Sequence, residues 1–143
     1  MHTLQQILNQ KETDEIWSVT ATATVFEAIQ VMADKRAGAL LVMDGGKLEG
    51  IISERDYARE VILKGRGSKQ TLVGEIMSTN IITVSAVDSV QNALELMTEH
   101  HIRHLPIVDD DKVAGVVSIG DLVKDVISVQ QTTIEQLENY IRS

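Results

Sequence analysis

The chain has 143 residues, enough for one well-buried domain and too few for two conventional ones. Hydrophobic residues make up 43% and charged residues 24%, as in soluble globular proteins, while aromatic residues make up only 3%, so we expect an aliphatic core. The absence of cysteine excludes disulfides and cysteine nucleophiles, and a net charge of -8 argues against loose binding to nucleic acid or to an anionic membrane surface.

The first half of the chain is predicted to fold in the order β-α-β-β-α. A short strand around residues 17–19 leads to Thr24, which can cap a helix. Apolar residues between positions 25 and 32 then recur at the i, i+3, i+4, i+7 spacing of one buried helical face. Two short apolar runs, 39–43 and 48–52, lie on either side of a turn and indicate a β-hairpin.

A second helix is expected from about residue 54 to residue 63, and Lys64–Lys69 forms a flexible basic linker. Residues 71–77 are predicted to form a short helix that leads into the second half. Residues 3–8 are expected to do the same before the first half.

The second half repeats the first. When the sequence is shifted by 65 positions, residues 16–62 lie over 81–127 without a gap and with 14 identities in 47 positions. The repeat predicts a strand at residues 82–84 and a closing helix that ends near Ser128. From Val129 the tail carries apolar residues on one helical face, so we expect it to dock on its own domain or on a partner.

Three stretches resemble the CBS (cystathionine-β-synthase-type) domain family: Thr24–Ala28, Ile102–Asp109 and Gly115–Leu122. The resemblance covers almost all of residues 3–128, and Ser53–Arg59 is similar to a bacterial stand-alone subgroup in which AMP-type and NAD-type ligands occur. It implies an α/β (α+β) fold of two β-α-β-β-α repeats related by pseudo-twofold symmetry. It also implies two ligand clefts between the repeats and a homodimer.

The expected division of the chain follows the repeats. Residues 1–66 form the first CBS repeat with its N-terminal helix, residues 67–128 form the second repeat, and residues 129–143 form a C-terminal amphipathic helix. The N-terminus lacks the basic start and apolar run of a signal peptide, and no apolar run is long enough to span a membrane. We therefore expect a cytoplasmic protein.

Two serine–aspartate motifs, Ser53-x-x-Asp56 and Ser118-x-x-Asp121, lie where a predicted strand becomes a helix. A capping box would explain either motif alone. Their recurrence at equal spacing in both repeats, where the family places its ligands, favours binding. An aspartate can accept hydrogen bonds from both ribose hydroxyls, and a helix N-terminus with a serine hydroxyl can hold phosphate.

The resemblance assigns further ligand contacts. Arg103 and His104 match the phosphate-contacting positions of the family, whereas Arg55, Arg66 and Lys69 are weaker candidates with a solvated surface role as the alternative. The adenine would lie against apolar residues, for which simple core packing is the alternative. These residues are Trp17, Ile82, Ile102, Ile51 and Val116.

The two clefts are expected to differ. The family pattern pairs each serine–aspartate motif with an adenine wall from the other repeat. Ser53 and Asp56 would then face bulky and charged residues around Ile102 and Arg103. Ser118 and Asp121 would face Trp17, Ala37 and Gly38, which leaves room for a larger nucleotide.

No metal site is expected. His100 and His104 have an i, i+4 spacing, but the helix should end near His101, so that His104 belongs to a strand. No catalytic residue is identified either, since neither serine has a histidine base in its sequence context. The leading hypothesis is a regulatory sensor module that binds AMP, ATP or NAD and acts on a regulated protein the sequence does not identify. The alternative is a structural homodimerisation module with empty or degenerate sites.

Overall fold

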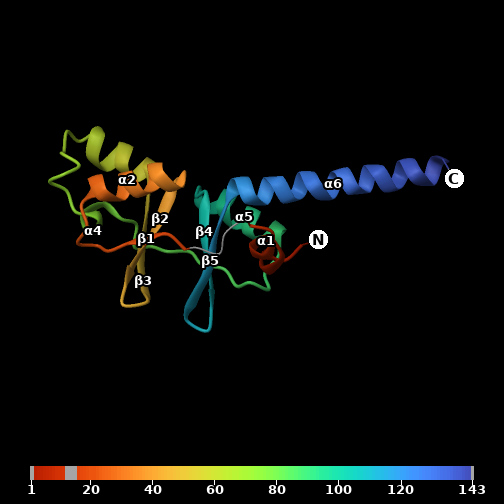
Figure 1. Cartoon of the computed structure of the whole chain (residues 1–143), viewed down its shortest axis with the longest axis horizontal. Coiled ribbons are helices and arrows are strands. Elements are labelled where there is room, and N and C mark those ends of the chain that lie inside the picture. The colour runs from red at the N-terminus through yellow and green to blue at the C-terminus, as the bar shows by residue number, and fades with distance from the viewer. Residues whose placement is uncertain (1, 12–15, 143) are drawn as a thin grey trace. The chain divides into compact units, whose positions relative to one another are not determined.

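The computed structural model describes residues 2–11 and 16–142 (Figure 1). The chain forms two compact units, one of residues 15–82 and one in which residues 1–14 join residues 83–143. Each unit combines helices with a small sheet, so the expected mixed α+β fold is confirmed. Among the described residues, no helix is both long and apolar enough to cross a membrane.

The unit of residues 15–82 is built on a three-stranded sheet of order β1-β2-β3, in which β1 runs parallel and β3 antiparallel to β2. One face of α2 supplies much of the core, because Val25, Ala28 and Met32 are at most 1% exposed. The hydroxyl of Thr24 caps α2 by accepting from the Glu27 N–H. The elements are β1 (Ser18–Val19), α2 (Val25–Lys35), β2 (Ala39–Asp44), β3 (Lys47–Ser53), α3 (Glu54–Tyr57), the π-helix η1 (Ala58–Ile62) and α4 (Val73–Ile76).

The other unit has the same core pattern. Val90, Ala93 and Met97 of α5 are at most 2% exposed and stand 65 positions after their counterparts in α2. Its sheet is the antiparallel pair β4-β5. The elements are α1 (Leu4–Gln10), α5 (Val90–His100), β4 (His104–Asp109), β5 (Lys112–Ser118) and α6 (Ile119–Arg142).

The strand predicted at residues 82–84 is reduced to a single bridge between Val84 and Ile107. In the first repeat the Leu41 N–H donates to the Trp17 carbonyl and extends β1 along β2. The residue equivalent to Leu41 is Pro106, which has no N–H to donate. The second repeat therefore loses one ladder hydrogen bond and the strand that depends on it.

Each of the two short helices that precede the repeats packs with a repeat other than the one that follows it in sequence. The Leu4 N–H of α1 donates to the Asp88 carbonyl at 2.9 Å, and the Val73 N–H of α4 donates to the Ala23 carbonyl at 2.8 Å. Thus α1, which precedes the first repeat, packs with the second, and α4 packs with the first. The compact units therefore do not follow the sequence division at residue 66.

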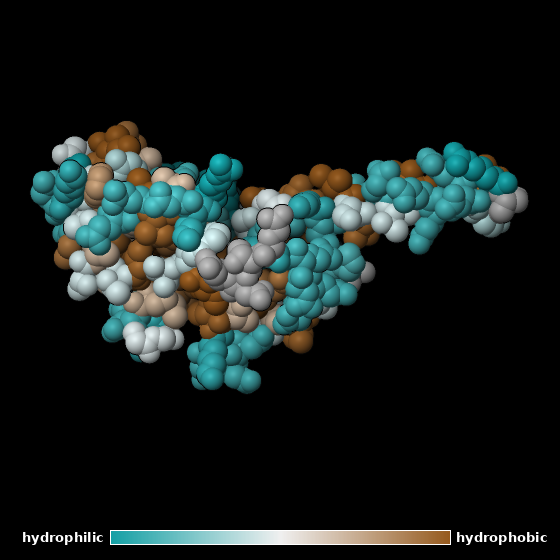
Figure 2. Space-filling model, in the orientation of Figure 1, coloured by the Kyte–Doolittle hydropathy of each residue, from teal (hydrophilic) through white to brown (hydrophobic). Residues whose placement is uncertain are grey.

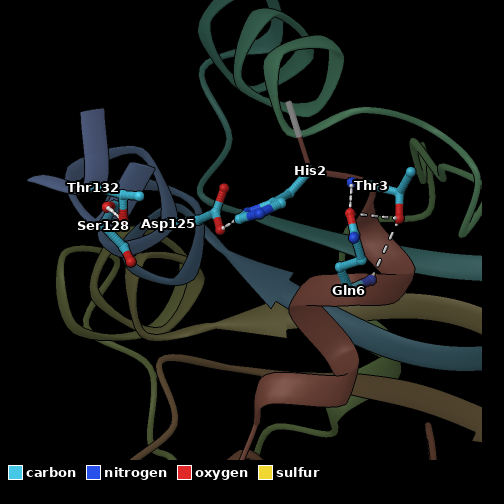
Figure 3. Close-up of polar contacts among 6 residues, drawn as sticks. All are labelled: His2, Thr3, Gln6, Asp125, Ser128 and Thr132. Atoms are coloured by element: carbon cyan, nitrogen blue, oxygen red, sulfur yellow. Dashed lines mark hydrogen bonds and ion pairs between the residues drawn. The ribbon is translucent and has the colours of Figure 1, made fainter. Parts of the chain in front are cut away.

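Helix α6 continues without a break past Ser128 to Arg142. No glycine or proline interrupts the sequence between Asp121 and Arg142. Within α6 the Thr132 hydroxyl donates to the Ser128 carbonyl at 3.1 Å. His2 Nδ1, from the N-terminal segment, lies 2.5 Å from Asp125 Oδ1 near the beginning of α6 (Figure 3). The beginning of α6 is thus held by the N-terminal segment, whereas residues 127–142 are exposed and do not dock on their own unit.

Candidate functional site

Both serine–aspartate motifs lie at a strand-to-helix junction, as predicted. Ser53 is the last residue of β3 and caps α3, and Ser118 is the last residue of β5 immediately before α6. A hairpin strand brings each serine out of the sheet, and the next residue starts the helix. The two repeats therefore present the same pair of side chains at the same structural position.

The first pair forms a closed capping box. The Asp56 N–H donates to Ser53 Oγ at 3.2 Å. The Ser53 N–H and Oγ–H donate to Asp56 Oδ2 at 2.9 and 3.0 Å, and none of these bonds uses Asp56 Oδ1. The capping alternative is therefore realised in this structure. It fixes the rotamer of the carboxylate, which a ligand-binding role also requires.

The second pair has matching geometry. The Asp121 N–H donates to Ser118 Oγ at 3.1 Å, and the Ser118 N–H donates to Asp121 Oδ2 at 2.8 Å. Ile119, the first residue of α6, donates its N–H to the Arg103 carbonyl at 2.8 Å. In the first repeat the Glu54 N–H donates to the Gly38 carbonyl at 3.0 Å in the equivalent way.

Lys11 contacts the second pair and has no part in the sequence prediction. Its Nζ donates to Asp121 Oδ2 at 3.1 Å and to the Val116 carbonyl at 2.9 Å. It reaches this position because α1 packs against β5, where a Cβ on Gly115 would lie 2.6 Å from Leu8 Cδ2. No motif in the sequence indicates this contact, because 110 positions separate Lys11 from Asp121.

Partial burial opposes ionisation of the Asp121 carboxyl, but the Ser118 backbone N–H and the Lys11 ammonium outweigh it and lower the pKa of Asp121 below its ordinary value. Asp121 is therefore a carboxylate at neutral pH. A carboxylate accepts hydrogen bonds and donates none, which suits it to sugar hydroxyls.

The predicted phosphate contacts lie beside the second pair. Arg103 is exposed, and its backbone is tied to α6 by the bond from Ile119. His104 is half-buried and is the register partner of Ser118. The helix α5 ends at His100 and His104 begins β4, as expected. Within the described parts of the chain, no group of three or more His, Asp or Glu side chains could hold a metal ion.

The weaker cationic candidates make contacts elsewhere in the unit of residues 15–82. Arg66 forms an ion pair with Glu75 at 3.3 Å. The Lys69 ammonium lies 4.8 Å from the centre of the Phe26 ring. These contacts agree with the surface role given as their alternative.

The predicted adenine-facing residues are all half-buried, and so is Gly38. Trp17 packs against the core of its own unit, and Ile51 exchanges two backbone hydrogen bonds with Ser78. Within a unit, the structure brings Gly38 to the Ser53 pair and Arg103 to the Ser118 pair. The predicted pairing of each motif with a wall from the other repeat stays a prediction. The remaining half-buried members are Ile82, Ile102 and Val116.

Comparison with known proteins agrees with the repeat. The family model described as the CBS domain matches twice, at residues 12–63 and 73–128. A solved structure of a putative signal-transduction protein with CBS domains from Burkholderia ambifaria is 48% identical. It superposes with a TM-score of 0.87 over 89% of this chain and 95% of its own.

Two further proteins are informative. The CBS domain-containing protein CBSX3, mitochondrial, of Arabidopsis thaliana is 41% identical over 138 residues, which cover 92% of this chain and 67% of that protein. The CBS domain pair of protein MJ0100 was solved in complex with 5′-methylthioadenosine and S-adenosyl-L-methionine. It is 25% identical, with a TM-score of 0.76 over 86% of this chain and 98% of its own. The chain therefore belongs to the CBS domain family, as a tandem pair of CBS domains.

Proposed function

We propose that the chain is a non-catalytic regulatory module that binds adenosine nucleotides of the AMP, ATP or NAD type through its two serine–aspartate pairs. The observation that carries the proposal is the recurrence of one helix-terminus geometry in both repeats, with serine-to-aspartate bonds of 2.8–3.2 Å. The adenosine-containing ligands of the MJ0100 domain pair support this ligand class.

The chemistry of the pair fits a ribose. In each motif the serine holds the aspartate in a fixed rotamer through Oδ2, so that Oδ1 is oriented without further loss of side-chain entropy. Two adjacent hydroxyls can then donate to one carboxylate. The carboxylate repels phosphate, and we assign Arg103 and His104 to offset that repulsion.

Lys11 gives the second site a further cation. Before a ribose is bound, its ammonium neutralises Asp121 at 3.1 Å. A ribose that donates to Oδ1 of Asp121 would leave this ion pair in place, and the third N–H of the Lys11 ammonium could donate to a phosphate group. We therefore expect the Ser118 site to favour ligands with more than one phosphate.

The proposal includes a homodimer in the cytoplasm that reports nucleotide level to a partner protein. A purely structural dimerisation module is the second candidate. It is favoured by the closed capping boxes, because a cap explains both motifs without a ligand.

Isothermal titration calorimetry with AMP, ATP and NAD distinguishes the nucleotide-binding module from the structural dimerisation module. Asp56→Ala and Asp121→Ala should each remove one binding event, whereas Asp88→Ala should leave binding unchanged. Asp88 is the matched control because it also accepts from the N–H of a serine three residues earlier, Ser85, at 2.8 Å. Wild-type protein that binds none of the three nucleotides at millimolar concentration supports the structural module instead.

A further inference from the structure

The exposed part of α6 carries a largely apolar seam. Val123, Ile127, Ile134, Leu137 and Ile141 are between 44% and 80% exposed. Together with Gln130 they follow one another at intervals of four, three, four, three and four residues. This is the a/d spacing of a heptad repeat, which places all six on one stripe of a helix. We refer to these six residues as the seam.

The seam faces away from the unit to which α6 belongs. Leu122 and Asp125 are the buried residues of α6 and point to the body of the unit. In Figure 2 brown apolar residues lie along the upper edge of α6 where it leaves the rest of its unit. A solvated helix with one apolar stripe is only marginally stable alone, so its length indicates that another surface covers the stripe.

The composition of the seam fits a second copy of the same helix. Its a positions are all isoleucine, at 127, 134 and 141, and its d positions include Val123 and Leu137. Branched aliphatic side chains at the a and d positions supply the apolar knobs that a facing helix of the same sequence can receive. Gln130 is the polar member of the seam and lowers its stability.

The charged residues beside the seam favour one of the two orientations, parallel or antiparallel, that two copies of α6 could adopt. The residues that flank the seam at e positions are Lys124, Gln131 and Glu138. In an antiparallel pair, e positions face e positions, so Lys124 of each copy meets Glu138 of the other. In a parallel pair, e positions face g positions, and Glu138 would meet Thr133. The antiparallel arrangement therefore makes two charge-complementary contacts that the parallel one lacks.

We infer that α6 pairs with α6 of a second copy of the chain in an antiparallel two-stranded coiled coil along the seam. Ile127 then packs against Leu137 of the other copy, Ile134 against Gln130, and Ile141 against Val123. This interface gives the proposed homodimer a specific contact surface. It lies on the exposed length of α6 and does not depend on nucleotide binding.

Cysteine cross-linking tests the register directly, because the native chain contains no cysteine. Ile127→Cys and Leu137→Cys proteins, distinguished by tags of different length, are oxidised separately and as a mixture. The mixture should form the mixed disulfide, and each protein alone should remain uncross-linked, since identical positions lie about 15 Å apart along an antiparallel pair. Self-cross-linking of Leu137→Cys alone, or no cross-link in the mixture, would overturn the inference.

A charge exchange tests the orientation without disturbing the apolar contacts. Lys124→Glu and Glu138→Lys should each weaken association by about tenfold in sedimentation equilibrium, because each creates two like-charge contacts. The double variant should recover the wild-type constant. Equal association of all four proteins contradicts the antiparallel pair.

A third comparison separates this interface from other surfaces and from the ligand sites. Leu137→Lys should be monomeric, and Gln136→Lys, one residue off the seam, should remain dimeric. A dimeric Leu137→Lys protein places the interface elsewhere, and a monomeric wild type at tens of micromolar excludes the pairing. Nucleotide titration of the same variants reports separately on the proposed function, and we expect unchanged binding to all of them.

Discussion

Asp56 and Asp121 occupy equivalent positions in the two repeats, and Lys11 makes their surroundings differ. Its ammonium lies 3.1 Å from Asp121 Oδ2, and the Asp121 side chain is 28% exposed. Such an ion pair contributes little to the free energy of unfolding when it is fully exposed to water, and more when it is partly buried. The contact therefore predicts a pH-dependent contribution to the stability of the second repeat.

Lys11→Met should lower the free energy of unfolding by about 0.5–1 kcal/mol at pH 7. The pKa of Asp121 is lowered in the folded protein, so its stabilising contribution is present above the unfolded pKa and is lost as the pH falls through the folded value. The difference between wild type and variant in urea titrations should shrink below pH 3.8, the ordinary value for this carboxyl. Lys47→Met at the exposed start of β3 is the control. A pH-independent difference would contradict the ion pair.

Arg103→Ala should weaken AMP and NAD by roughly ten- to a hundredfold, because a hydrogen bond to a charged group contributes about 1.5–3 kcal/mol. Adenosine, which lacks the phosphate, should bind nearly as before. Calorimetry with the three ligands checks this, with Arg142→Ala at the distal end of α6 as a charge-matched control. Equal losses for AMP and adenosine would show that Arg103 does not contact phosphate.

At the scale of single elements, the two hairpins differ in their turns. The first uses Gly45 and Gly46 at φ of +56° and +87°, and the second uses Asp110 and Asp111 at +50° and +61°. Both turns need the left-handed region, which glycine and asparagine enter more readily than aspartate. The second hairpin therefore carries backbone strain that the first does not.

Asp110→Asn combined with Asp111→Gly should raise the free energy of unfolding by about 1 kcal/mol. The reciprocal change, Gly45→Asp with Gly46→Asp, should lower it. Denaturant titrations in 1 M salt remove most of the effect of the altered net charge. Unchanged or reduced stability of the Asn-Gly variant would show that the second turn is not strained.

The same elements show how much of the fold the sequence could predict. The 65-residue shift located both hairpins and the stripes of α2 and α5, because short apolar runs and 3.6-residue periodicity are local signals. The strand at residues 82–84 was wrong because repeat matching transferred a strand to a site where Pro106 cannot donate. The closing helix ran past Ser128 because nothing in the local sequence stops it.

At the scale of the whole molecule, α1 and α4 belong to compact units that the sequence order did not indicate. Leu4 and Val73 are both 0% exposed, and each donates its N–H to the repeat that is not the next one in sequence. Contacts between residues that lie 84 positions apart, as Leu4 and Asp88 do, or 50 apart, as Val73 and Ala23 do, leave no periodic signal. The lysine beside Asp121 was missed for the same reason, although both serine–aspartate motifs lie at the strand-to-helix junctions where they were predicted.

Leu4→Ala should destabilise the unit of residues 83–143 by about 2–5 kcal/mol, as expected when a buried leucine is truncated. Native-state hydrogen exchange should show lost protection in β4 and β5 before any loss in β2 and β3. Val73→Ala is the matched variant and should show the reverse order, with a smaller effect for its smaller side chain. Lost protection of β2 and β3 in Leu4→Ala would contradict the assignment of α1 to the second repeat.

Under the proposed function, each repeat contributes one adenosine-nucleotide site through its serine–aspartate pair. Native mass spectrometry of the chain with AMP, ATP and NAD counts bound nucleotides directly. The wild type should bind two per chain, Asp56→Ala and Asp121→Ala one each, and the double variant none. A double variant that retains the wild-type number of nucleotides, or a wild type that binds none, would contradict the claim.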